Sequence, residues 1–261
     1  MQIDTFLARW RAAGGSERAN YQLFIADLCA LLEVDPPQPA NEDTRDNPYV
    51  FERRVIFHHG DGSTSNGFID CYKRGSFIGE AKKIRAGSET RQFDDALLRA
   101  RGQAENYARH LPADEGRPPF LVVLDVGNVI ELYAEFTCTG GSYTPFPDPR
   151  SHRIRLDDLS KPEIRARLKA VWHDPHSLDP ARRTARATRE IAVRLARVAQ
   201  SLEGKYQPER VAAFLSRCLF SMFAEDVGLL PKVDNEGAFT GLLKTLQHAP
   251  QQFVPLVAEL W

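Results

Sequence analysis

Residues 67–84 read GFIDCYKRGSFIGEAKKI, and this stretch decides the fold class. It contains two short runs rich in aromatic and aliphatic residues, separated by the polar turn Lys73-Arg74-Gly75-Ser76. Such a pattern predicts two antiparallel strands joined by a short turn. A further run of this kind, RRVIFHH at 53–59, precedes the turn GDGSTSNG. The sequence therefore predicts an antiparallel meander of three strands.

Helices and further strands surround the predicted meander. Helical periodicity marks residues 16–34 before it and residues 91–111 after it, because apolar side chains recur there every three or four positions. Two more β-rich runs follow at 120–126 and 129–136, and Gly127-Asn128 between them is a hairpin signal. Helix, three strands, helix and two strands in this order predict an α+β fold, an α/β sandwich, rather than a repeated βαβ array.

The second half of the chain has a different pattern. From about Leu156 the remaining segments show helical periodicity, at 161–172, 181–203, 207–227 and 236–260. The proline-rich stretch PFPDPRSH separates these segments from the strands. We therefore expect a boundary near residue 150, with an α+β domain over residues 1–150 and an all-helical domain over residues 151–261.

Composition excludes several classes of protein. Lys and Arg total 34 against 35 for Asp and Glu, so the net charge of the 261-residue chain is -1 and any nucleic-acid-binding surface has to be local. The polar N-terminus is not typical of a signal peptide, and no apolar run reaches about 18 residues, so we expect a cytoplasmic protein with no membrane span. The cysteines are far apart in sequence, which argues against a structural zinc site or a disulfide framework: Cys29, Cys71, Cys138 and Cys218.

Three residues of the meander suggest phosphodiester chemistry. Alternation along a strand places Glu80 and Lys82 on the same face, roughly 7 Å apart, and the turn at 73–76 brings Asp70 beside Glu80. Two carboxylates are the usual protein ligands of Mg²⁺, which also keeps several waters. Lys82 would orient or deprotonate the attacking water, or stabilise the transition state. The pattern predicts catalytic Asp70, Glu80 and Lys82, with Asp70 and Glu80 holding Mg²⁺.

This spacing resembles the signature of the PD-(D/E)xK nuclease superfamily. Asp70 is followed by nine residues and then by Glu80-Ala81-Lys82, although Ile69 replaces the proline of the motif. The helix that follows contains Gln103-Ala-Glu-Asn-Tyr107, which looks like the QxxxY element of the RecB-like branch. The resemblance implies a restriction-endonuclease-like core that cleaves double-stranded DNA, with Gln103 and Tyr107 supporting the site.

Nearly the whole chain resembles the N-terminal part of MmeI-type (Type IIL) restriction–modification enzymes. The segments that carry the resemblance are ERANYQLFIADLCALL, YVFERRV, GFIDCYKRGSFIGEAKK, QAENYA and FLSRCLFSMFAEDVGLLP. In that family a nuclease domain and a helical connector precede an adenine methyltransferase domain and a target-recognition domain. We therefore expect a truncated chain. S-adenosylmethionine would act only through a downstream domain, since its binding motif and the NPPY-type tetrapeptide do not occur in this sequence.

Some assignments stay open. Glu17 is either a further metal ligand or a glutamate favoured by the dipole of the first helix turn, and Glu52 is either a charge at a strand edge or a neighbour of the site. His58 and His59 are expected to be structural or exposed, because adjacent strand residues face opposite sides. Arginines in the predicted helix 181–203 either track DNA phosphates or form a solvated face, with Arg182, Arg183, Arg186 and Arg189 as the candidates for DNA binding.

Two other functions remain as alternatives to the nuclease. The first is a non-cleaving DNA-binding or scaffolding region of a phage-defence DNA methyltransferase, similar to those of the DISARM systems. The second is a protein-interaction module with an incidental acidic patch. Retention of Asp70, Glu80 and Lys82 together favours the nuclease, because a site that no longer cleaves has no reason to keep all three.

Overall fold

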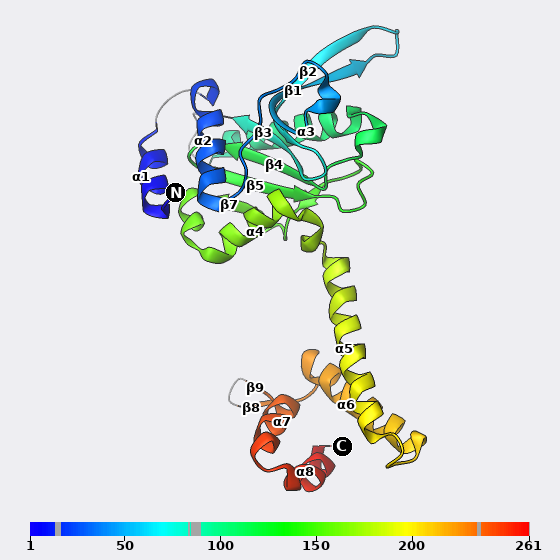
Figure 1. The fold of residues 1–261 in the computed structure, drawn as a ribbon. Coiled ribbons are helices and arrows are strands. Elements are labelled where there is room, and N and C mark those ends of the chain that lie inside the picture. Colours follow the sequence, from blue (N-terminus) through cyan, green and yellow to red (C-terminus); the bar gives the residue numbers. More distant parts are fainter. Residues whose placement is uncertain (14–16, 83, 85–89, 234–235, 261) are drawn as a thin grey trace. The chain divides into compact units, whose positions relative to one another are not determined.

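The computed structural model describes residues 1–13, 17–82, 84, 90–233 and 236–260 (Figure 1). These residues form two compact units, Met1–Arg183 and Thr184–Trp261.

The first unit contains a mixed sheet. In the described residues seven strands join in the order β1-β2-β3-β4-β5-β6, with β7 paired to β5. Their bounds are β1 Tyr49–His58, β2 Thr64–Lys73, β3 Phe77–Lys82, β4 Phe120–Asp125, β5 Val129–Ala134, β6 Thr144–Pro145 and β7 Arg153–Arg155. The pairing of β3 with β4 is parallel and the others are antiparallel. The expected meander corresponds to β1, β2 and β3, and the expected hairpin to β4 and β5, so the α+β fold class is confirmed.

Helices cover both faces of this sheet (Figure 1). The helices α1 (Ile3–Ala12), α2 (Glu17–Leu32) and α4 (Pro162–His173) share one hydrophobic core with the sheet. The helix α3 (Arg91–His110) packs on the opposite face in a second core. It supplies the crossover that the parallel pairing of β3 and β4 requires. The side chains of β4 and β5 are buried throughout, because each central strand lies between two helical layers.

The first unit extends beyond the boundary expected near residue 150. Trp172 on α4 is fully buried, and its ring centroid lies 4.4 Å from that of Phe77 on β3. Its indole Nε1 donates a hydrogen bond of 2.9 Å to the hydroxyl of Tyr49 on β1. The division between the compact units instead falls after Arg183. Helical periodicity does not reveal this, because it shows that α4 has an apolar face but not which surface that face covers.

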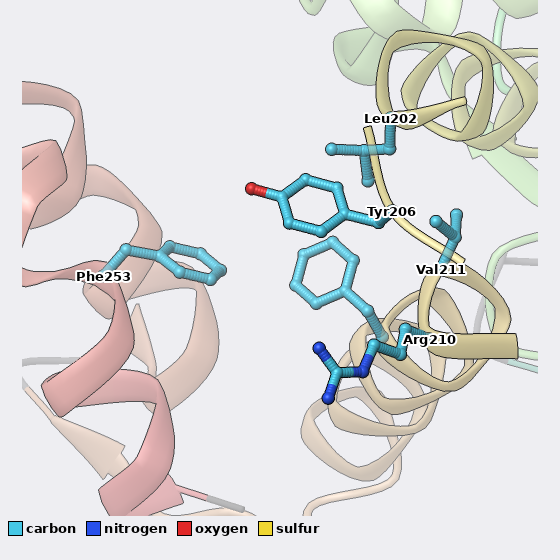
Figure 2. Close-up of a pocket in the computed structure, with 6 residues that line it drawn as sticks. Leu202, Tyr206, Arg210, Val211 and Phe253 are labelled. Carbon is cyan, nitrogen blue, oxygen red and sulfur yellow. The ribbon is translucent and has the colours of Figure 1, made fainter. Parts of the chain in front are cut away.

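The second unit is mainly helical, as expected. It contains most of α5 (Pro180–Leu202), with α6 (Pro208–Asp226), α7 (Ala238–His248) and α8 (Phe253–Leu260). A two-residue ladder joins β8 (Lys232–Val233) to β9 (Glu236–Gly237). Leu202, Tyr206 and Phe253 line an apolar pocket between these helices (Figure 2). No helix in the described ranges is long and apolar enough to cross a membrane.

Candidate active site

The strands β2 and β3 separate at the predicted catalytic residues. Their ladder ends at the pair Cys71 and Gly79, one residue before Asp70 and Glu80 are reached, although both strands continue. We call this opening the fork. The Asp70 side chain spans it, because Asp70 Oδ2 accepts a hydrogen bond of 2.7 Å from the main-chain N–H of Ala81. Asp70 therefore lies against the segment that carries Glu80 and Lys82.

Glu80 and Lys82 form an ion pair on the α3 side of β3. The Lys82 Nζ lies 2.5 Å from Glu80 Oε1, and the side chains are 30% and 1% exposed respectively. Alternation along β3 explains their common face, since Ile78, two residues before Glu80, is buried in the α3 core. A buried carboxylate is costly unless it is paired. Lys82 lowers this cost while its ammonium group still reaches solvent.

The donor set of the fork fits a hard divalent cation. Asp70 and Glu80 offer carboxylate oxygens from adjacent strands. The nearby thiol of Cys71 is a poor competitor, because burial raises its pKa well above the usual value and it packs in the core on the α1 side. Within the described part of the chain, no group of three or more His, Cys, Asp or Glu side chains is placed to hold a metal ion. Asp70 and Glu80 would hold a cation at the fork with water as further ligand, an arrangement usual for Mg²⁺.

Gln103 and Tyr107 contact each other on α3. The Gln103 Nε2 donates a hydrogen bond of 3.1 Å to the Tyr107 hydroxyl. The Tyr107 ring stacks on Phe57 of β1 with the centroids 5.7 Å apart. Gly67 of β2 makes this approach possible, since a Cβ there would come within 2.5 Å of both rings. The described contacts thus connect the pair to the β1–β2 hairpin, three residues along β2 from Asp70.

The other residues named from sequence lie elsewhere. Glu17 begins α2, but its side chain lies outside the described part of the structure. His58 and His59 are exposed, as expected, and His59 Nε2 lies 2.9 Å from the Ser65 hydroxyl. The four arginines considered for DNA binding are exposed on α5 and belong to no strand of the fork: Arg182, Arg183, Arg186 and Arg189.

Glu52, which sequence left undecided, is a neighbour of Asp70. It lies on β1 between the register pairs Phe51–Cys71 and Arg53–Ile69, and therefore opposite Asp70 on β2. The buried Tyr21 hydroxyl of α2 donates a hydrogen bond to Glu52 Oε1. The pKa of Tyr21 is raised above its usual value, first by burial and then by this hydrogen bond, and the charges of Glu52 and Asp70 add to the rise.

The backbone of Glu52 is left-handed, with φ of 52°, in the middle of a strand. At this point the odd-numbered side chains of β1 and β2 change from one face of the sheet to the other. Phe51 and Cys71 pack in the core on the α1 side, whereas Val55 and Ile69 pack in the core on the α3 side, although all four are odd-numbered. Regular alternation would keep each strand's odd-numbered residues on one face. Sequence carries no signal for this reversal, because glutamate rarely adopts positive φ.

This conformation predicts an unusual order of stability at position 52. At an ordinary strand position valine is more stable than glycine, because of its higher β propensity. A left-handed backbone costs a β-branched residue roughly 1–2 kcal/mol, whereas glycine adopts it freely. We expect Glu52→Gly to be more stable than Glu52→Val by about 1 kcal/mol in urea unfolding. The opposite order would show that the strand is regular at this position.

Comparison with known proteins assigns the chain to a family. The model of the family described as "MmeI, N-terminal domain" matches residues 1–205, and the model described as "MmeI, helicase spacer domain" matches residues 209–261. No curated protein and no solved structure matches the chain. The two matches together span nearly all of the sequence, and the boundary between them falls in the turn between α5 and α6. This chain belongs to the MmeI family.

Proposed function

We propose that this chain is the Mg²⁺-dependent DNA-cleaving region of a restriction–modification enzyme, with its active site at the fork. Membership of the MmeI family supports a restriction–modification role and DNA as the substrate. The observation that carries the nuclease assignment is the fork itself. There the Asp70 carboxylate accepts a hydrogen bond from the main chain between Glu80 and Lys82, which are themselves paired.

In this proposal each residue of the fork has a separate task. When bound, the cation neutralises charge on the phosphate and lowers the pKa of a coordinated water. Asp70 and Glu80 would bind it from two adjacent strands. Lys82 holds the attacking water by a hydrogen bond or stabilises the charge that develops on the phosphate oxygens. Gln103 and Tyr107 support the hairpin beside the fork.

Pairing with β4 supports the segment that carries Glu80 and Lys82. The strand β3 pairs with β4 along its whole length, from Phe77 opposite Phe120 to Lys82 opposite Asp125. Asp125 is fully buried at the end of β4, and its Oδ1 accepts a hydrogen bond of 2.9 Å from the Ile84 main chain. The strand β4 therefore holds the Glu80–Lys82 segment along its length and just beyond its C-terminal end, which favours a preorganised site.

The test is cleavage of supercoiled DNA with Mg²⁺, combined with calorimetric titration of the cation. We expect the wild-type protein to nick the DNA and both Asp70→Ala and Lys82→Ala to be inactive. Only Asp70→Ala should also lose cation affinity, because Lys82 is not a ligand in this proposal. Lys169→Ala is the matched control, since Lys169 pairs with Glu33 at 3.2 Å on an exposed surface.

Two outcomes would contradict the proposal. A wild-type protein that binds DNA but never nicks it would support a non-cleaving scaffold for a DNA methyltransferase. A protein that does not bind DNA at all would leave only the protein-interaction module. Products with 5′-phosphate and 3′-hydroxyl ends are expected if the chemistry follows the PD-(D/E)xK type.

A further inference from the structure

The helix α5 is strongly basic, unlike the chain as a whole. It contains six arginines, one glutamate and no lysine, so its formal charge is +5, whereas the whole chain has a charge of -1. The guanidinium group is planar and binds phosphate through two parallel hydrogen bonds, which an ammonium group does not do. The six arginines are Arg182, Arg183, Arg186, Arg189, Arg194 and Arg197.

The charges of α5 lie on one side of the helix. With 3.6 residues per turn, positions 182, 186, 189 and 197 share one face. Apolar residues form the opposite face, at Ile191, Leu195, Val198 and Leu202. Arg189 and Ile191 are two residues apart, which is about 200° around the helix and confirms that the two faces are opposed. We call the first of them, with the flanking Arg183 and Arg194, the arginine face.

Burial in the described residues shows that part of the apolar face packs against the second unit. Leu195 and Leu202 are partly buried, and Leu202 lines the apolar pocket with Tyr206 and Phe253 (Figure 2). In contrast, no residue of α5 is fully buried, and the Arg186 side chain is 83% exposed. The second unit thus packs against the part of the apolar face formed by Leu195 and Leu202, whereas Ile191 and Val198 stay exposed, and the arginine face is left to solvent.

Acidic side chains in the described residues pair with only part of this face. Arg186 pairs with Glu190 at 2.9 Å, and Arg182 lies 3.8 Å from Asp179. Among the described residues there is no acidic partner for Arg189, Arg194 or Arg197. A helix with several unneutralised arginines on one exposed side has the charge and the geometry to bind a polyanion.

We propose that the arginine face of α5 binds the sugar–phosphate backbone of double-stranded DNA without reading its sequence. The inference rests on the proposed function for the choice of DNA among polyanions. Arg182 and Arg197 are 15 positions apart, which is about 22 Å along the helix axis. Phosphates follow each other every ~3.4 Å along a DNA strand, so this length covers several of them.

The experiment measures duplex binding by fluorescence anisotropy as a function of salt, without Mg²⁺ so that no DNA is cleaved. The test variant is the triple substitution Arg186→Gln, Arg189→Gln and Arg197→Gln. Each phosphate contact contributes a slope of about 0.9 in a plot of log affinity against log salt concentration. We expect the slope to fall by about 2 to 3 and the affinity at low salt to fall at least about tenfold.

Two control variants separate a binding face from a general effect of charge. Lysine at the same three positions should restore most of the salt slope, because the charge returns. The triple substitution Arg9→Gln, Arg45→Gln and Arg150→Gln removes three exposed arginines of the first unit and should leave the slope unchanged. Circular dichroism should show the same helix content in all variants, since these side chains are exposed. Equal losses in the test variant and the first-unit variant would overturn the proposal.

Results on DNA nicking and on vesicle binding separate this inference from the nuclease proposal and from membrane binding. If the test variant keeps the wild-type slope, α5 does not contact DNA, even if the wild type nicks DNA through Asp70. If the test variant loses the slope while the wild type never nicks DNA, this inference holds and the nuclease proposal fails. If wild-type protein binds vesicles of phosphatidylserine more tightly than the duplex, and the test variant abolishes that binding, the arginine face is a membrane-surface helix and the proposal is wrong.

Discussion

Glu80→Gln is expected to reduce Mg²⁺-dependent DNA cleavage by about 100- to 1000-fold, the loss typical of removing one electrostatic group from an active site. Glutamine has the shape of glutamate and keeps an acceptor for Lys82, but it lacks the negative charge that binds the cation. Glu80 is almost fully buried, so its carboxylate carries a desolvation cost that glutamine avoids, and Lys82 is 30% exposed and can be solvated once the charge of its partner is lost. We therefore expect the free energy of unfolding to stay equal or to rise by about 1 kcal/mol.

A loss of DNA cleavage without a loss of stability would separate a catalytic role of Glu80 from a structural one. Single-turnover cleavage measures the first and urea unfolding measures the second. Glu33→Gln is the matched control, because Glu33 also pairs with a lysine but is exposed. That control should change neither quantity. If Glu80→Gln cleaves DNA at the wild-type rate, Glu80 does not hold the cation, whatever happens to stability.

Glu115→Ala is expected to lower the free energy of unfolding by about 3–5 kcal/mol, the usual cost of removing one partner from a buried ion pair. Glu115 lies 2.5 Å from the Arg53 guanidinium, and the two side chains are only 3% and 2% exposed. Glu115 also accepts a hydrogen bond of 2.8 Å from the Tyr72 hydroxyl. Its loss would leave a buried positive charge without its carboxylate.

Chemical denaturation of two further variants tests this explanation. Arg53→Met combined with Glu115→Leu should recover much of the lost stability, because no buried charge remains. Glu33→Ala should cost less than about 1 kcal/mol, since its ion pair is exposed. A double variant as unstable as Glu115→Ala would show that packing, and not the unpaired charge, causes the loss.

This buried network lies near the fork. Arg53 follows Glu52 on β1, and Tyr72 lies two residues after Asp70 on β2. The network therefore holds β1 and β2 together next to the point where their odd-numbered side chains change from one face of the sheet to the other. We expect Glu115→Ala to weaken cation binding at the fork in proportion to the fraction of protein that unfolds, and not beyond it.

Local patterns were sufficient for most of the fold of the first unit. The meander β1–β3 and the hairpin β4–β5 follow from short β-rich runs and from turn residues between them, which act within a few positions of each other. Local patterns could not predict that α4 packs on the sheet of the first unit. Trp172 on its apolar face contacts Phe77 of β3, which lies almost 100 residues earlier in the chain.

The sequence by itself determined the three residues of the candidate site, the order of the elements and the family. Asp70, Glu80 and Lys82 were recognisable because strand alternation and a short turn relate them locally. Only the tertiary structure decided that β2 and β3 separate at these residues and that Glu52 lies opposite Asp70. It also decided that α5 keeps an exposed arginine face. These features depend on contacts between distant segments and on a left-handed backbone that glutamate does not prefer, so no local pattern encodes them.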